Sequence, residues 1–123
     1  MKFLLVFIGG GIGSTLRYWA QGLVYNRMGS GFPYGTVLVN IVGCFVIGLL
    51  MVALEERFLA TPALRVFLTV GILGGFTTFS SFSFETLALF RDGESLLALA
   101  NVGLSMVVCL CATWTGMKLG RLV

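Results

Sequence analysis

The sequence predicts an all-α membrane protein in which four helices cross the bilayer as one domain, residues 1–123. Hydrophobic residues make up 58% of the chain and charged residues only 11%, so a soluble fold of this length would lack the polar surface to cover itself. Four apolar stretches are each long enough for the roughly 20 helical residues that cross a hydrocarbon core. They run over about 3–25, 35–54, 66–90 and 96–117.

The ionised residues stand mostly between these spans, which marks out a compact four-span bundle. With four spans, both termini and the second loop share one side of the membrane. The basic residues on that side are Lys2, Arg57, Arg65, Lys118 and Arg121. Those on the opposite side are Arg27 and Arg91. This excess favours both termini in the cytoplasm, but its margin is small enough to leave insertion in both orientations open.

The first two spans contain a charge and an amide where donors are scarce. A charge deep in a membrane helix costs on the order of 2.5–3.5 kcal/mol even on lenient scales. Arg17 either snorkels to the headgroups past Tyr18 and Trp19 or is a functional cation that attracts anions, and the sequence leaves both readings open. Asn40, near the start of the second span, offers two N–H donors.

The third span contains the least expected segment, residues 74–85, with the sequence GGFTTFSSFSFE. Gly74 and Gly75, followed by Thr77 and Thr78, predict a helix that stops and restarts in mid-membrane, because glycine ends helices and threonine caps them. Backbone freed at that depth needs a partner. The carbonyls of the first half favour a cation, and the N–H groups of the second half favour an anion.

Phenyl rings and hydroxyls alternate directly after this predicted break. On a helix, their spacing keeps three rings within one face while serines interleave with them: Phe76, Phe79 and Phe82 with Ser80, Ser81 and Ser83. A row of phenyls alone is usually packing. Ring edges together with hydroxyl donors, however, suit a small anion stripped of water. Glu85 is the one intramembrane carboxylate available to carry a proton.

The fourth span carries small or polar residues every four positions, which places them on a face toward the bundle: Asn101, Ser105, Cys109 and Thr113. Interhelical hydrogen bonding explains this stripe at least as well as an ion path does. The chain has no histidine and no CxxC motif, so we expect Cys44, Cys109 and Cys111 to be buried small hydrophobes and not a metal or redox site.

Several function classes are excluded by what the chain lacks. An intramembrane enzyme needs a nucleophile with a base, and Ser80 and Ser81 have neither a histidine in the chain nor a GxSxG motif around them. The few charged residues form no basic patch for nucleic acid, and no ATP motif is present. The sequence therefore predicts a protein that is not an enzyme and binds neither nucleic acid nor nucleotide.

The motifs together resemble the Fluc (CrcB) fluoride channels. The resemblance rests on the run 71–83, on Gly-x-Gly with Arg17 in the first span, and on residues 35–40 opening the second span. It extends over essentially the whole chain in length, span count and motif order. It implies an antiparallel, dual-topology homodimer with two pores and a structural sodium ion at its centre. The implied activity is passive fluoride efflux across the bacterial inner membrane, which relieves fluoride toxicity.

Carried over residue by residue, the resemblance implies that the backbone carbonyls of Gly74 and Thr77 bind the sodium ion together with those of the partner subunit. Phe79 and Phe82 would be ring-edge anion contacts. The polar residues of the anion pore would be Asn40, Ser80, Ser81, Glu85 and, in the fourth span, Ser105. Arg17 matches the first-span arginine of the family, as an anion-attracting or structural cation.

Two further transport functions remain as alternatives. Small dual-topology exporters share the size and the four spans, but their coupling needs a carboxylate in the first span, where this chain has Arg17. A proton-coupled fluoride exchanger is the closer competitor. A response of the fluoride flux to a pH gradient would distinguish it from a channel.

Overall fold

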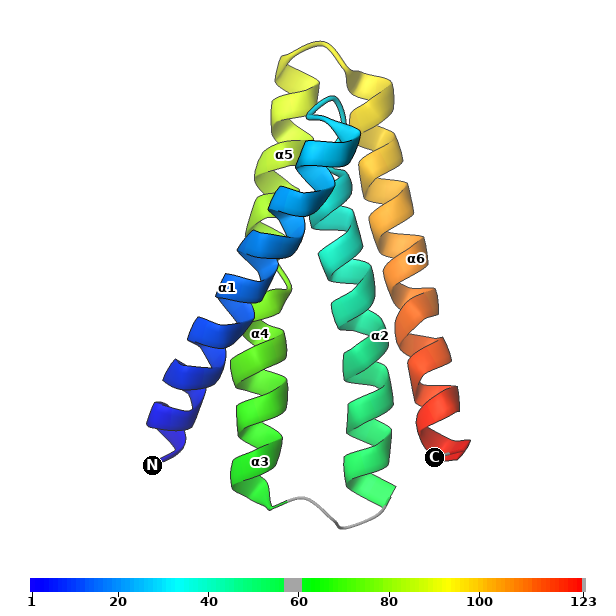
Figure 1. Ribbon diagram of the computed structural model, residues 1–123. Helices are drawn as coiled ribbons and strands as arrows, with labels where there is room; N and C mark the ends of the chain where they lie inside the picture. Colours follow the sequence, from blue (N-terminus) through cyan, green and yellow to red (C-terminus); the bar gives the residue numbers. More distant parts are fainter. Residues whose placement is uncertain (57–60, 123) are drawn as a thin grey trace.

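The computed structural model describes residues 1–56 and 61–122, and in these ranges all regular structure is helical (Figure 1). The first, second and fourth spans are α1 (Lys2–Met28), α2 (Tyr34–Glu56) and α6 (Ser95–Leu122). The third span consists of four consecutive segments: α3 (Pro62–Val66), the π-helical η1 (Phe67–Leu73), α4 (Gly74–Phe76) and α5 (Phe79–Arg91). Arg57, which enters the charge count for orientation, lies outside the described residues.

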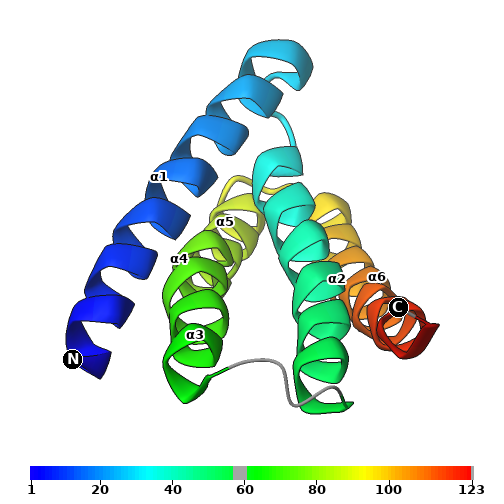
Figure 2. The same cartoon turned by 60° about the horizontal axis from the view of Figure 1, so that its bottom comes forward.

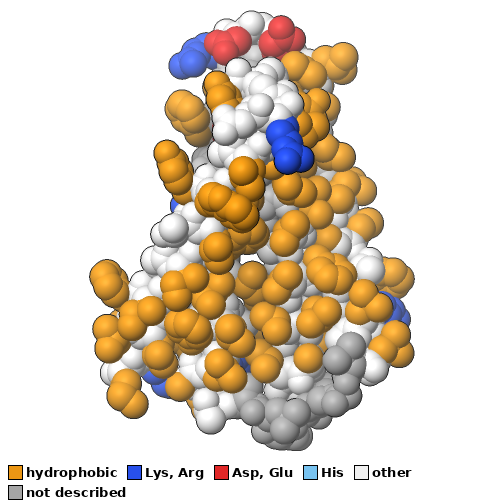
Figure 3. Space-filling model, in the orientation of Figure 1, with side chains coloured by type: hydrophobic (Ala, Val, Ile, Leu, Met, Phe, Trp, Pro, Cys, Tyr) orange, Lys and Arg blue, Asp and Glu red, His pale blue; other side chains and the backbone are white. Residues whose placement is uncertain are grey.

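Four helical stretches are long and apolar enough to cross a membrane: Lys2–Met28, Tyr34–Glu55, Pro62–Arg91 and Ser95–Leu122. They confirm the prediction of an all-helical chain with four apolar helices, and each extends slightly beyond its predicted bounds. Hydrophobic side chains cover most of the face seen in Figure 3, where acidic side chains are confined to one end. Large apolar residues such as Phe3 and Leu110 are 92% and 70% exposed, as expected of helices surrounded by lipid.

The helices associate in two pairs, each held by close backbone contact. In both views α2 and α6 run side by side, whereas α1 crosses the third span (Figures 1 and 2). A Cβ atom on Gly48 of α2 would overlap the Thr113 carbonyl of α6, and one on Gly116 would overlap the Phe45 carbonyl. Glycine therefore brings the α2 and α6 backbones into contact, as small residues do between membrane helices.

Glycine also brings α1 and the third span into close backbone contact. A Cβ on Gly9 would lie 2.9 Å from the Gly71 Cα atom, and one on Gly13 would overlap the Ile72 carbonyl. Both α1 glycines are buried. Gly9 and Gly13 form a small-xxx-small pair in α1, and this pair mediates close packing against the third span.

The third span departs from helical geometry at Thr77 and Thr78. Gly74 is helical, with φ −61° and ψ −36°, and α4 continues to Phe76. Thr77 (ψ 156°) and Thr78 (ψ 110°) are extended, and α5 begins at the next residue. The prediction that the glycines end a helix is wrong: a Cβ on Gly75 would lie 2.6 Å from the Gly10 carbonyl oxygen, so packing against α1 is what requires glycine there.

Thr78 caps the helix that follows. Its hydroxyl oxygen accepts a hydrogen bond from the Ser81 amide at 3.2 Å, which satisfies one of the donors left free in the first turn of α5. The prediction that threonine caps the second half is confirmed. The change of direction falls after the glycines, so the rings before and after it need not share a face.

Candidate functional site

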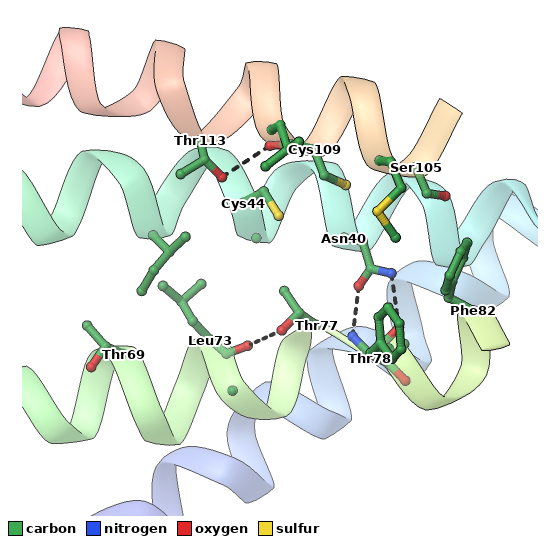
Figure 4. Close-up of a pocket in the computed structure, with 16 residues that line it drawn as sticks. Asn40, Cys44, Thr69, Leu73, Thr77, Thr78, Phe82, Ser105, Cys109 and Thr113 are labelled. Atoms are coloured by element: carbon green, nitrogen blue, oxygen red, sulfur yellow. Dashed lines mark hydrogen bonds between the residues drawn. The ribbon is translucent and has the colours of Figure 1, made fainter. Parts of the chain in front are cut away.

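The side-chain amide of Asn40 forms a clasp around Thr78, one of the two extended residues of the third span, by bonding both of its backbone polar groups. Its Nδ2 donates to the Thr78 carbonyl at 3.0 Å, and the Thr78 amide donates to its Oδ1 at 2.7 Å (Figure 4). In a continuous α-helix the Thr78 amide would donate to the Gly74 carbonyl. Because that amide is engaged by Asn40, the carbonyl of Gly74 loses its helical donor at this point.

A cavity of about 390 Å³ opens beside this clasp, between α2, the third span and α6 (Figure 4). It brings together six of the predicted pore and sodium-site residues: Asn40, Gly74, Thr77, Phe79, Phe82 and Ser105. Most of the surface that lines this cavity is apolar. Three of its polar residues, Asn40, Thr78 and Ser105, lie toward the end of the cavity where Phe82 lies (Figure 4), which is the juxtaposition that the sequence pattern predicts for a dehydrated anion.

Only two of the three phenyl rings share this cavity. The centroids of Phe79 and Phe82 lie 5.3 Å apart with their planes at 45°. Phe82 is 7% exposed, whereas Phe79 is 69% exposed in the single chain. Phe76 lines a separate apolar pocket with Leu16 and Trp19. The prediction that all three rings occupy one face is therefore wrong, because two extended residues separate Phe76 from the others.

Ser81 and Glu85 lie in a second cavity, of about 450 Å³, beside α1 and the start of α2. A hydrogen-bonded chain crosses it: Gln21 Nε2 donates to Thr36 Oγ1 at 3.0 Å, and Thr36 Oγ1 donates to Glu85 Oε1 at 2.8 Å. The other carboxylate oxygen, Oε2, is buried and has no hydrogen-bond partner among the described residues. Buried polar atoms are normally hydrogen-bonded, so Glu85 Oε2 is an exception that needs a partner.

Gln21 and Thr36 were not singled out in the sequence. A signal for them exists: Gln21 stands four residues after Arg17, and Thr36 stands four residues before Asn40. On a helix, that spacing places each on the same face as a polar residue already marked as a candidate.

The Thr78 hydroxyl connects the two cavities. Thr78 lines the first cavity, and its Oγ1 donates to Ser81 Oγ, in the second cavity, at 3.0 Å. It also lies 3.3 Å from Ser80 Oγ. Ser80 itself is exposed. Thr78 was considered in the sequence only as a helix cap, but its position makes it part of the site.

Arg17 extends toward the interruption of the third span. Its Nη1 lies 3.5 Å from the Thr77 carbonyl oxygen, a long hydrogen bond, and the residue is half-buried. A snorkelling arginine would instead direct its guanidinium to the headgroups. The side chain thus places a positive charge beside the carbonyl edge of α4.

The polar stripe of the fourth span faces the bundle, as predicted. Asn101 is 1% exposed and Ser105 is 6% exposed. Asn101 Nδ2 donates to Thr86 Oγ1 of α5 at 2.9 Å, and Ser105 Oγ donates to Asn101 Oδ1 at 3.4 Å. Interhelical hydrogen bonding accounts for Asn101, while Ser105 both joins that network and lines the first cavity.

Comparison with known proteins adds independent information. A model of the family described as CrcB-like protein, Camphor Resistance (CrcB), matches residues 4–117. The chain is 50% identical over 121 residues to the fluoride-specific ion channel FluC of Geotalea daltonii, covering 97% of this chain and 98% of that protein. It is 45% identical over 118 residues to the protein of the same name from Methylocella silvestris, covering 94% and 90% of the two chains. The names of these relatives describe an ion channel and not an enzyme. On this evidence, and with four apolar helices, the chain belongs to the CrcB-like family.

Proposed function

We propose that the chain is a fluoride-specific ion channel that mediates passive fluoride efflux across the bacterial inner membrane and so relieves fluoride toxicity. The observation that carries this proposal is the first cavity, where Phe79 and Phe82 stand beside Asn40 and Ser105. The names of the relatives agree with it. As a member of a family whose named relatives are channels, the chain is not an enzyme.

The cavity offers an anion partial replacements for its water. Phenyl ring edges are electropositive, and hydroxyl and amide N–H groups donate. Asn40 Nδ2 carries two hydrogens and spends one on the Thr78 carbonyl, so the second is free to meet a passing anion. None of these groups carries a full positive charge, so an anion can enter without being held too tightly to leave.

The second cavity would continue the anion path. Thr78 lines the first cavity together with the phenyl pair, and its hydroxyl contacts the hydroxyls of Ser80 and Ser81. Glu85 lies one turn further along α5. Arg17 supplies positive potential at the interruption of the third span. An anion moving from the phenyl rings to Ser80 and Ser81 would exchange one donor for the next, whereas the Glu85 carboxylate accepts hydrogen bonds and is not one of these donors.

A structural sodium ion fits the carbonyl edge of α4 in part. Sodium is a hard cation and prefers oxygen ligands, as other hard cations do. The Gly74 carbonyl has lost its Thr78 donor to Asn40, and a Cβ on Gly74 would meet only the Thr69 carbonyl oxygen, at 3.8 Å. Thr77 is the second ligand, and there the Arg17 guanidinium competes for the same oxygen. Two carbonyls from one chain leave most of a coordination shell to be filled.

An antiparallel homodimer would complete both the ion site and the pores. A second copy related by a two-fold axis near Gly74 would double the carbonyl ligands, as an isologous interface requires. Phe79 is 69% exposed in the single chain, so a partner is also needed to close the anion path around it. Two equivalent paths, and insertion in both orientations, follow from that symmetry.

A proton-coupled fluoride exchanger is the second candidate, and the unpartnered Oε2 of Glu85 is the observation that favours it. An intramembrane carboxyl with a free oxygen is the group that a proton carrier would need. The small multidrug-type exporter is less well supported, because α1 contains Arg17 and no carboxylate.

The decisive experiment measures fluoride and chloride release from proteoliposomes with ion-selective electrodes. A channel should release fluoride far faster than chloride, with a rate that does not depend on an imposed pH gradient when the membrane potential is clamped. Fluoride release that requires or follows the pH gradient would replace the channel with the exchanger. Release of neither ion would overturn both.

A further inference from the structure

The first cavity contains a cluster of sulfur atoms that the anion path does not use. Cys44 of α2, Cys109 of α6 and Met106 of α6 all line it. Cys44 and Cys109 each lie one turn before residues whose backbones are in contact, Gly48 of α2 and Thr113 of α6, and Figure 4 shows both side chains at the cavity. Cys111 is exposed and lies outside the cavity lining. The sequence expectation of three buried cysteines is therefore wrong for Cys111.

The helix packing fixes the spacing of the thiol pair. Gly48 and Gly116 place the α2 and α6 backbones in contact at Thr113 and Phe45, one turn or less from the cysteines. Cys44 and Cys109 thus sit on two helices that cannot separate without losing this contact. A pair of ligands held in place by rigid elements binds an ion at a lower entropic cost than two mobile side chains would.

We propose that Cys44 and Cys109 form a binding site for a soft, divalent cation that prefers two thiolate ligands, with Hg²⁺ as its probe. Thiolates are the ligands that soft cations select. Binding of one cation to two thiols forms two metal–sulfur bonds and releases two protons, so the complex is neutral. A neutral product suits a cavity whose lining is mainly apolar, where a net charge would be costly. The Met106 thioether is a third, weak donor.

Cations that require four ligands fit this site poorly. Structural zinc takes four cysteine, histidine or carboxylate ligands in a tetrahedron. The described residues contain no group of three or more such side chains that could hold a metal ion. The site should therefore discriminate for two-coordinate cations and against zinc.

An ion at this site would lie in the cavity that contains Asn40, Phe79 and Phe82, so it should obstruct anion passage. This consequence rests on the proposed channel function. The binding itself does not, and the two are measured separately below.

Binding is tested on purified full-length protein in detergent carrying Cys111→Ser, which leaves only the proposed pair. Hg²⁺ should bind at one ion per chain and consume two thiols, measured by thiolate-to-mercury absorbance and by titration of the remaining free thiols. Adding Cys44→Ser or Cys109→Ser should weaken binding, measured against a competing monothiol, by about two orders of magnitude or more. Equal affinity in single-thiol and two-thiol proteins would overturn the proposal. So would consumption of two thiols per ion by single-thiol proteins, since that places the site between chains.

Obstruction is tested in proteoliposomes by fluoride release. Hg²⁺ should block release by the Cys111→Ser protein at least tenfold more effectively than release by the Cys44→Ser/Cys111→Ser protein. If Cys111→Ser vesicles release no fluoride before Hg²⁺ is added, the channel proposal fails while the binding result stands. If they release fluoride and bind Hg²⁺ through both thiols without inhibition, the cation lies outside the anion path, which overturns the obstruction.

Discussion

The two halves of the third span meet at Thr77 and Thr78 and are held in opposite ways. Before them, η1 and α4 contact α1 through backbone atoms, with Gly71 and Gly75 admitting the approach. After them, α5 is tied to its neighbours by side-chain hydrogen bonds, such as that between Thr36 and Glu85. The first half is joined mainly by close backbone packing, with one long hydrogen bond from Ser14 Oγ to the Gly75 carbonyl at 3.5 Å, and the second half is joined by side-chain hydrogen bonds.

This difference assigns separate tasks to the two halves. A backbone contact tolerates no added atom, so the first half acts as a fixed support for the interruption. Hydroxyl, amide and carboxyl groups gather on the second half and around it, where they line the cavities. Substitutions at the glycine contacts before Thr77 should therefore impair folding, while substitutions of cavity-lining groups after it should impair ion flux.

The largest effect is expected from Gly13→Leu, at the contact of α1 with the first half. The new side chain would overlap the Ile72 carbonyl, and overpacking costs about 1–3 kcal/mol or more when backbone has to move. We expect little or no folded protein, measured as monodisperse yield and thermal unfolding in detergent. Gly11→Ala is the control, since a Cβ there meets nothing within 4 Å. Equal losses in both variants would show that close approach is not what the first half depends on.

Phe82→Ile should abolish fluoride release while leaving a folded protein. Isoleucine keeps the site apolar but removes the electropositive ring edge offered to the anion. Phe79→Ile should have the same effect. The matched control is Phe76→Ile, because Phe76 precedes the interruption and lines a different pocket. Fluoride release that is unchanged in Phe82→Ile and Phe79→Ile, or lost equally in Phe76→Ile, would remove the distinction between the halves.

Asn40→Asp should reduce fluoride release at least tenfold and also loosen the interruption. A carboxylate cannot donate to the Thr78 carbonyl, and loss of a buried partner costs about 1–3 kcal/mol. Its negative charge would also repel the anion. Asn26→Asp, exposed near the end of α1, controls for added charge. Normal rates in Asn40→Asp would exclude Asn40 from the path.

The smallest effect is expected from Thr36→Val, which removes the hydroxyl between Gln21 and Glu85 but keeps the shape. Loss of the hydrogen bond to Glu85 should lower the free energy of unfolding by about 1–3 kcal/mol, and fluoride release should fall severalfold. Thr15→Val is the control, since Thr15 is exposed and bonds only the Gly11 carbonyl of its own helix. Thr36→Ser should restore release. Failure of that rescue would assign Thr36 a packing role.

The sequence predicted the helices well because the bilayer leaves few other choices for such apolar segments. It also predicted the polar face of α6, where periodicity alone determines the face. It misplaced the interruption, because glycine at positions 74 and 75 reads equally as a helix end and as a close contact. The same error placed Phe76 on one face with Phe79 and Phe82.

The site was predicted less completely than the fold. Asn40 was expected to be a donor, but its dual bond to Thr78 depends on two spans meeting, which no local pattern reveals. Gln21 and Thr36 were missed although their spacing from Arg17 and Asn40 places them on the same helix faces as those residues. Single polar residues in apolar helices carry meaning only once their neighbours are known.

The Asn40 clasp has a consequence for local motion. Backbone outside a helix ordinarily opens first, and its amide protons exchange with deuterium soonest. At Thr78 both backbone polar groups are engaged by a side chain from another helix, so its amide proton should exchange as slowly as those inside α5. The bend in the third span would then be among the stiffest places in the chain, and a gate would have to lie elsewhere.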